Sequence, residues 1–256
     1  MEQSATVVKD NPAAPFGFYE AEAAGLRWLA RAHGVRTARI VAQEPGRIEL
    51  ERVIEVEPDA AAAHRFGTDL ARTHAAGASA FGARPKGYHG LLYIGEREMP
   101  AAEEESWGAF YARDRVLPFL QAAVWAGNVD ADCERDVREA CDLIASGRFD
   151  DDEPPARLHG DLWRGNVLFS ADGAVLIDPA AHGGHRETDL AMLELFGFPF
   201  LDEVIAGYEE AAPLAAGRRE RIPLHQLHPL AVHAAGHGHA YGAALHDAAL
   251  ATLALA

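Results

Sequence analysis

The sequence predicts an α+β protein with two unequal lobes: a small N-terminal lobe that contains β-strands, and a large, mainly helical C-terminal lobe. Three observations predict this class. Strand-like segments gather before residue 53, helical periodicity dominates from residue 58 onward, and strand character returns only at 157–178. We therefore expect an N-lobe at residues 1–52 and a C-lobe at residues 53–256. With 256 residues, 49% of them hydrophobic, the chain can bury a sizeable core.

In the small lobe the sequence predicts short strands at residues 6–9 and 37–42, with a helix at 18–32 between them. A third strand is expected at 47–53, where Ile48 and Leu50 alternate with charged residues, as in a half-buried strand. These elements are enough for a small sheet covered by one helix.

In the large lobe the pattern is helical, with helices expected at 58–76, 103–125, 130–146, 187–196, 201–211 and two more after residue 226. The exception is a hairpin in the segment 157–178. Two apolar runs, 167–169 and 175–177, flank the dipeptide Asp172-Gly173, which strongly favours a hairpin turn. The acidic, proline-bearing stretch 150–155 indicates a loop before it.

Composition excludes several classes of partner. With 39 acidic and 23 basic residues the formal net charge is −16, which opposes binding to a nucleic acid or an anionic membrane surface and favours a small neutral or cationic partner. Cys133 and Cys141 lie too far apart on a helix to form a disulfide, so we expect two reduced thiols. No apolar run is long enough for a membrane span, and the N-terminus does not resemble a signal peptide. We expect a soluble, cytoplasmic protein, of open oligomeric state.

The predicted hairpin has the geometry of a metal site. Asn166 lies six residues before Asp172 and Asp178 six residues after it, so antiparallel pairing is expected to place their side chains about 5 Å apart. Two oxygen donors at that separation can share a hard cation such as Mg²⁺. A third carboxylate, Asp161, lies just before the hairpin.

The string from His159 to Asn166 fits the pattern H-x-D-L-x-x-x-N. In that pattern the Asp accepts the proton of a substrate hydroxyl and the Asn holds a metal ion. A polar loop that caps a hairpin by chance is the alternative, and it requires many positions to coincide.

A second constellation lies in the small lobe. Glu22 falls on the same helical face as the apolar residues Phe18, Leu26 and Leu29, and a carboxylate that points inward needs a cation. Lys9, at the end of the first strand, is the nearest candidate, and such a pair orients the lysine that holds the phosphates of ATP in kinase-like enzymes. A surface lysine and a helix-stabilising glutamate remain the alternative.

These motifs carry a family resemblance. The run LHGDLWRGNVLF, followed by VLIDPAAHGGHRETDLAMLELFG, resembles the fructosamine (ketosamine) kinases, a family in the aminoglycoside-phosphotransferase-like branch of the protein-kinase-like fold. The likeness extends over nearly the whole chain. Trp163, where antibiotic kinases more often have histidine, and Pro179-Ala180, where protein kinases have Phe-Gly, favour the ketosamine kinases.

The resemblance implies an ATP-dependent and Mg²⁺-dependent kinase that phosphorylates the third-carbon hydroxyl of a ketosamine, a glycated amine or a glycated protein lysine, and so promotes deglycation. A kinase of the same fold with another acceptor, such as an aminoglycoside, choline or a sugar, and a non-catalytic binding module stay open. The roles implied by the resemblance are a catalytic base at Asp161, magnesium ligands at Asn166 and Asp178, a phosphate-positioning pair at Lys9 and Glu22, an adenine-contacting hinge at or near Glu51, and at Asp189 a buried acceptor of hydrogen bonds from the catalytic-loop backbone.

One departure from the family pattern concerns the start of the chain. The glycine-rich turn that covers the ATP phosphates has no counterpart, because Lys9 lies only eight residues from the start. We therefore expect a truncated small lobe and weakened nucleotide binding. A shortened gene model, a natural truncation and a degenerate kinase remain open as explanations.

Thirteen histidines could suggest a further metal site, and His233 and His237 have helical i, i+4 spacing. Without a glutamate between them in an HExxH motif, we favour a structural or substrate-facing role over a zinc site. His182 and His185, in the loop AHGGHRE, are candidates for substrate contact, with plain loop solvation as the alternative. His159 and Trp163, within the H-x-D-L motif, are further candidates for contact with the substrate or support of the site.

Overall fold

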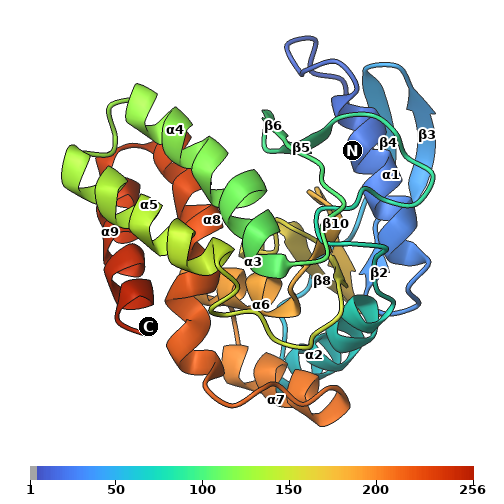
Figure 1. Ribbon diagram of the computed structural model, residues 1–256. Coiled ribbons are helices and arrows are strands. Elements are labelled where there is room, and N and C mark those ends of the chain that lie inside the picture. Colours follow the sequence, from blue (N-terminus) through green and yellow to red (C-terminus); the bar gives the residue numbers. More distant parts are fainter. Residues whose placement is uncertain (1–4) are drawn as a thin grey trace.

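A computed structural model describes residues 5–256 of the chain (Figure 1). Its small lobe contains β1 (Thr6–Lys9), α1 (Phe18–Ala30), β2 (Arg36–Thr37), β3 (Ile40–Glu44) and β4 (Arg47–Glu51). Three of the strands form an antiparallel sheet in the order β1-β4-β3, in which Lys9 lies opposite Ile48. The buried side chains of Leu26, Ile48 and Leu50 join α1 to this sheet. The strand predicted at 6–9 is confirmed with the same bounds, and the predicted helix and the strand at 47–53 are confirmed with slightly shorter bounds.

The strand predicted at 37–42 is split in two. β3 stays in the small sheet, whereas β2 pairs in parallel with β9 (Gly173–Leu176) of the large lobe. The boundary between residues 52 and 53 stays a prediction, and its N-terminal residues 1–4 lie outside the described part of the chain.

The large lobe is mainly helical, as predicted. Its helices are α2 (Ala60–Ala75), α3 (Trp107–Phe110), α4 (Leu117–Trp125), α5 (Ala131–Ala145), α6 (Arg186–Leu195), α7 (Leu201–Ala211), α8 (Arg218–His237) and α9 (His239–Leu253). Two bounds differ from expectation. The helix expected at 103–125 is interrupted by the π-helix η1 (Tyr111–Val116). The helix α8 begins at Arg218, well before residue 226, and contains Pro223 and Pro229.

The hairpin around Asp172-Gly173 is confirmed, but its predicted register is wrong. β8 (Val167–Ser170) pairs antiparallel with β9, with Ser170 opposite Gly173. The loop therefore consists of residues 171 and 172, and Asn166 accepts a hydrogen bond from the N–H of Ile177 rather than lying opposite Asp178. Asp178 consequently lies just beyond the paired residues.

Two further strand pairs complete the site region. β7 (Ala156–Leu158) and β10 (His182–Gly184) pair antiparallel and flank residues 159–166, here called the catalytic loop after their predicted role, which contain the short 3₁₀-helix η2 (Arg164–Asn166). β5 (Leu92–Ile94) and β6 (Arg97–Met99) form a hairpin that the sequence analysis did not predict. In Figure 1 this hairpin lies between the helices of the large lobe and α1.

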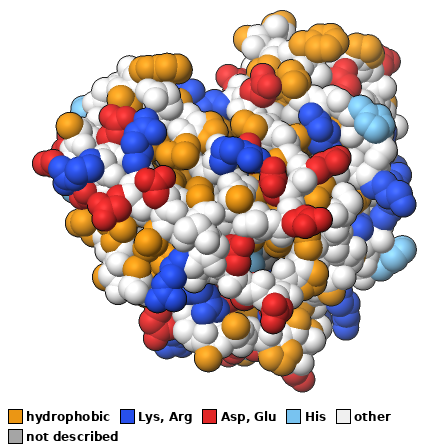
Figure 2. Space-filling model, in the orientation of Figure 1, with side chains coloured by type: hydrophobic (Ala, Val, Ile, Leu, Met, Phe, Trp, Pro, Cys, Tyr) orange, Lys and Arg blue, Asp and Glu red, His pale blue; other side chains and the backbone are white. Residues whose placement is uncertain are grey.

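Cys133 and Cys141 are buried and unpaired, as predicted. Within residues 5–256 no helix is both long and apolar enough to cross a membrane. On the face seen in Figure 2, acidic and basic side chains are interspersed, so the net charge of −16 does not gather there in a patch of one sign.

Candidate active site

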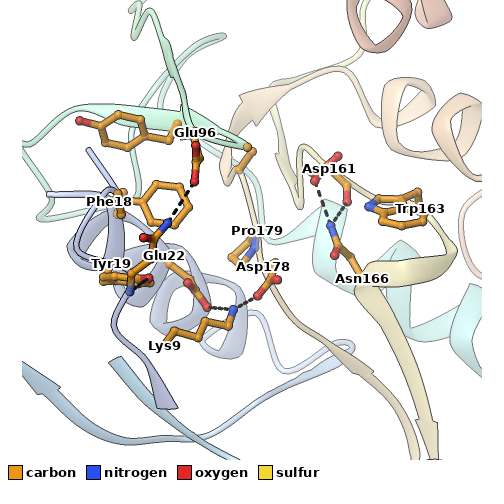
Figure 3. A pocket seen from close by; sticks show the side chains of 16 residues that line it. Lys9, Phe18, Tyr19, Glu22, Glu96, Asp161, Trp163, Asn166, Asp178 and Pro179 are labelled. Atoms are coloured by element: carbon orange, nitrogen blue, oxygen red, sulfur yellow. Dashed lines mark hydrogen bonds and ion pairs between the residues drawn. The ribbon is translucent and has the colours of Figure 1, made fainter. Parts of the chain in front are cut away.

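A cavity of about 400 Å³ lies between the small lobe, the β5–β6 hairpin and the catalytic loop (Figure 3). Its size is in the range of small-molecule sites. The lining side chains that could bind a ligand or take part in a reaction are charged, polar or aromatic: Lys9, Glu22, Glu96, Asp161, Trp163, Asn166 and Asp178. The structure thus gathers in one place the residues that the sequence placed in two separate constellations.

Lys9 and Glu22 form the ion pair predicted for the small lobe. The Lys9 Nζ donates to Glu22 Oε1 at 2.7 Å, and the Glu22 side chain is only 7% exposed. Burial raises the pKa of Glu22, Lys9 opposes this shift, and the nearby Asp178 carboxylate adds to it. Burial acts to lower the pKa of Lys9, but Glu22 and Asp178 outweigh it and raise that pKa above its ordinary value. The lysine is therefore held in its charged form.

Asp178 reaches the same cation from the other lobe. Its carboxylate contacts the Lys9 Nζ, and its side chain is 45% exposed toward the cavity. The backbone of Asp178 lies in the left-handed region at φ 52°, which few residues other than glycine adopt. Such strained residues cluster at functional sites, where the surrounding structure holds them in place.

Asp161 and Asn166 form the second half of the site. The Asn166 Nδ2 donates to the backbone oxygen of Asp161 at 2.8 Å and to its Oδ2 at 3.0 Å (Figure 3). These bonds fix the carboxylate relative to the loop. Burial raises the pKa of Asp161, against the opposing effects of His159 and the Asn166 hydrogen bond. A carboxylate with a raised pKa is a stronger proton acceptor.

The catalytic loop is held from behind by Asp189. Its buried carboxylate accepts the backbone N–H of His159 at 2.7 Å and that of Gly160 at 3.0 Å. These are the hydrogen bonds that the family resemblance implied. Asp189 also lies 3.2 Å from the Nε2 of His74, whose Nδ1 meets the Tyr208 hydroxyl at 2.8 Å. Sequence reasoning missed His74 and Tyr208, because both lie on helix faces without a motif.

His159 braces the loop rather than lining the cavity. Its Nδ1 accepts the N–H of Asp161 at 3.3 Å, which leaves Nε2 to donate to the Ile177 oxygen at 2.9 Å. The ring therefore joins the catalytic loop to the segment just before Asp178.

Trp163 lines the cavity and is 40% exposed. Its ring contacts Phe196 edge-on, and Phe196 in turn packs against His233. His233 and His237 lie side by side with ring centroids 5.2 Å apart. Among residues 5–256, no group of three or more His, Cys, Asp or Glu side chains is arranged to hold a metal ion. The structural or substrate-facing role of these histidines stays a prediction.

Besides His159 and Asp189, three more of the candidate residues do not line the cavity: His182, His185 and Glu51. His182 and His185 were expected in a solvated loop or against the substrate, but their exposures are 3% and 4%. His182 bonds to Arg115 and His185 to Asp151, so their rings are occupied in the interior. Glu51 pairs with Arg36 at 2.5 Å and accepts the backbone N–H of Arg39, at the end of β4. Its place near an adenine-contacting hinge stays a prediction.

Sequence reasoning also missed the wall formed by the β5–β6 hairpin. Tyr93, Gly95 and Glu96 line the cavity from this hairpin, and Glu96 accepts a hydrogen bond from the Asn11 side chain at 3.3 Å. The signal available in the sequence was the apolar run Leu91–Ile94 followed by Gly95.

The residues present fit a magnesium ion. The amide nitrogen of Asn166 donates to Asp161, which leaves the side-chain oxygen of Asn166 as a possible ligand. The Asp178 carboxylate is partly exposed in the same cavity. An oxygen-only donor set with room for phosphate and water is what Mg²⁺ prefers. Although the register of the β8–β9 hairpin differs from the predicted one by one residue, the side chains of Asn166 and Asp178 both line this cavity.

Comparison with known proteins identifies the family. The fructosamine kinase family model matches residues 1–254. The chain belongs to the fructosamine kinase family. It is 30% identical over 244 residues to a protein of Enterococcus faecium assigned as a ketoamine kinase, covering 94% of this chain and 85% of that protein. A crystal structure assigned to the fructosamine-3-kinases, from Thermobifida fusca, is 47% identical with a TM-score of 0.90, covering 97% of this chain and 85% of that one.

More distant structures extend the likeness to the fold alone. The choline kinase LicA of Streptococcus pneumoniae superposes with a TM-score of 0.63 at 15% identity, covering 98% of this chain and 86% of that one. This fructosamine kinase family member therefore has the protein-kinase-like fold that the motifs predicted, with a small sheet-containing lobe and a large helical lobe.

Proposed function

We propose that this chain transfers a phosphoryl group from ATP to a sugar-derived hydroxyl of a ketosamine, with Mg²⁺ as cofactor. The observation that carries the proposal is the single cavity that Lys9, Asp161, Asn166 and Asp178 share. The assignments of its relatives as ketoamine and fructosamine-3-kinases support the acceptor class.

The residues of the chain divide the chemistry between them. Asp161, held by Asn166, would orient the acceptor hydroxyl and take its proton. Lys9, oriented by Glu22, would bind phosphate oxygens of ATP. Asn166 and Asp178 would hold Mg²⁺, which supplies charge neutralisation to the phosphates when bound. Most of the catalysis would then come from positioning of the two substrates.

The charge of the cavity supports both the metal and an amine-bearing acceptor. Four carboxylates line it, from Glu22, Glu96, Asp161 and Asp178, and Lys9 is the one basic side chain among its described lining residues. Opposite charges lower the energy of such a site. A ketosamine fits better than a neutral sugar, because it carries an amine next to its sugar carbons.

A substrate panel tests the proposal. With magnesium and ATP, we expect fructose- and ribulose-modified lysine to be phosphorylated at the third-carbon hydroxyl in preference to free sugars, choline or kanamycin, as followed by ³¹P NMR of the product. Faster phosphorylation of choline or an aminoglycoside than of every ketosamine would assign the chain to another acceptor class. No phosphoryl transfer to any acceptor, together with no binding of magnesium-ATP by calorimetry, would leave a non-catalytic binding module.

A further inference from the structure

Arg115 is a buried cation without an acidic partner. It is 1% exposed, and its guanidinium carbon lies 4.5 Å from the centroid of the Phe110 ring. Within residues 5–256 it forms no ion pair with a carboxylate, and its Nη2 finds no hydrogen-bond partner. Burial lowers the pKa of Arg115 to about 9, although Asp114 nearby opposes the shift. A buried charge that lacks an opposite charge costs stability, so its presence requires another reason.

The backbone around Arg115 is unusual as well. Arg115 lies in the π-helix η1, whose wider turn is closed by a hydrogen bond from the N–H of Leu117 to the oxygen of Ala112. Helices of this kind are rare and occur frequently at functional sites. The sequence predicted one continuous helix here, so η1 is an interruption that propensity does not explain.

The guanidinium connects to the segment that follows Asp178. Its Nε donates to His182 Nε2 at 3.2 Å, and His182 Nδ1 in turn donates to the backbone oxygen of Ala180 at 2.8 Å. This pattern requires a neutral ring, and burial lowers the pKa of His182 well below its ordinary value. One imidazole thus links Arg115 to a peptide group two residues beyond Asp178.

The catalytic loop packs against that same hydrogen bond. Gly160, with φ 82°, comes so close that a methyl group on its Cα would lie 2.2 Å from the oxygen of Ala180 and 2.9 Å from His182 Nδ1. Gly160 immediately precedes Asp161 in the chain. The position of the Ala180–His182 pair therefore sets the position of the loop that carries Asp161.

A third wall of the cavity is tied to the same side chain. Arg115 Nη1 donates to the backbone oxygen of Pro100 at 2.6 Å, directly after β6. The β5–β6 hairpin, which brings Tyr93 and Glu96 to the cavity, is thereby anchored to the guanidinium that supports the Asp178 segment.

We propose that Arg115 is a positioning residue for phosphoryl transfer: through His182 it fixes the segment Asp178–Ala180 and the adjoining catalytic loop. The proposal rests on the role of Asp178 as a magnesium ligand in the proposed function. It explains why an Arg without an acidic partner is buried in a π-helix, since its donors are used on backbone and imidazole groups around the site rather than on a carboxylate.

The first test is Arg115→Met, which keeps an apolar stem against Phe110 and removes the donors. We expect a melting temperature that is unchanged or higher, since a buried charge is removed. We expect kcat to fall about 10–100-fold, the effect of a displacement on the order of 1 Å. The magnesium concentration for half-maximal rate should rise, and the gain in ATP affinity that magnesium provides in calorimetry should shrink, with KM for the acceptor little changed.

Arg157→Met is the matched control. Arg157 also stacks on an aromatic ring, that of Trp28, but its guanidinium donates to the backbone oxygens of Trp28, Ala76 and Gly77 rather than to the Asp178 segment. Its backbone pairs with Gly183 in β10, and the substitution leaves that pairing in place. We expect this variant to keep its kcat and its magnesium dependence. The positioning role would be overturned if Arg115→Met kept the kcat and the magnesium dependence of the wild type, whatever its melting temperature.

A double-mutant cycle provides the decisive readout and does not depend on Arg115→Met alone. His182→Asn keeps a donor near the Ala180 oxygen, but its shorter side chain has no atom at the Nε2 position to accept from Arg115. If the two residues act as one unit, Arg115→Met adds little in the His182→Asn background, whereas additive losses overturn the relay. If Arg115→Met does not fold, a normal magnesium dependence in His182→Asn overturns it. Asp178→Asn separates the two claims: if it leaves magnesium dependence unchanged, the proposed metal site itself fails.

Discussion

Lys9 and Asp178 contact each other through the Lys9 Nζ and a carboxylate oxygen, although 169 positions separate them in the sequence. Lys9 bonds at the same time to Glu22 in the buried face of α1. One ammonium group therefore joins the small lobe to the segment that follows β9. We therefore expect a change at Lys9 to act both on the proposed nucleotide binding and on the contact between the lobes.

The first prediction concerns this cation. Lys9→Met removes the charge that we assign to the phosphates, so KM for ATP should rise at least tenfold, since a hydrogen bond to a charged group contributes about 1.5–3 kcal/mol. Glu22→Gln should have a smaller effect, because Lys9 keeps Asp178 as a partner. Steady-state kinetics with varied ATP measures both. Lys86→Met, at an exposed lysine remote from this cavity, is the control, and an equal rise in KM there would show that the effect is not specific.

The second prediction concerns the proposed base. Asp161→Asn keeps the shape of the side chain and removes the proton acceptor, so kcat should fall by orders of magnitude while the melting temperature stays within a few degrees of the wild type. Asp172→Asn, in the exposed hairpin turn, should keep full activity. Unchanged turnover in Asp161→Asn would show that another group accepts the proton.

The features that sequence predicted best are those that a local signal specifies. The Asp172-Gly173 dipeptide indicated the hairpin, and the spacing of the motif placed Asp161 and Asn166 in one loop. The register was missed by one residue, because the prediction centred the turn on Asp172 and so implied a loop with an odd number of residues. In the structure the loop has two residues, 171 and 172, and Gly173 already pairs with Ser170.

The features that sequence missed depend on contacts between distant segments. A glycine-rich loop with two histidines predicts exposure to solvent, yet His182 is buried and accepts a hydrogen bond from Arg115, 67 positions earlier in the chain. The β5–β6 hairpin was missed because only a short apolar run, Leu91–Ile94, precedes its turn. Its placement depends on anchors such as the bond from Arg97 to the oxygen of Ala235 in α8. Tertiary partners of this kind leave no periodic pattern in the sequence.

The third prediction concerns Asp189 and pH. The hydrogen bond and charge of His74, with the loop N–H groups, outweigh burial and lower the pKa of Asp189 in the folded state. A lowered pKa means that its contribution to stability is complete above the pKa of the unfolded chain and is lost as pH falls through the folded value. Asp189→Asn should therefore reduce the free energy of unfolding by about 2–3 kcal/mol at pH 7.

The pH dependence distinguishes this effect from a simple loss of packing. The difference in unfolding free energy between wild type and Asp189→Asn should shrink between pH 5 and pH 3, as measured by urea denaturation at a series of pH values. Asp69→Asn, at a partly exposed ion pair of α2, should show little difference at any pH. A gap for Asp189→Asn that stays constant down to pH 3 would contradict the lowered pKa.

The fourth prediction compares two glycines with similar backbones and different surroundings. Gly160 and Gly46 have φ values of 82° and 73°, so a side chain at either position costs on the order of 1–2 kcal/mol for the left-handed conformation. A Cβ at Gly46 would have no atom within 4 Å, whereas at Gly160 it would lie 2.2 Å from the oxygen of Ala180. Gly160→Ala must therefore displace the catalytic loop or the segment after Asp178.

We expect Gly46→Ala to lower the melting temperature by a few degrees with kcat unchanged. We expect Gly160→Ala to lower kcat by at least tenfold, because the displaced loop carries Asp161. Thermal unfolding and steady-state kinetics on both variants measure the difference, and equal kcat values would show that the close approach of Gly160 to Ala180 does not position the base.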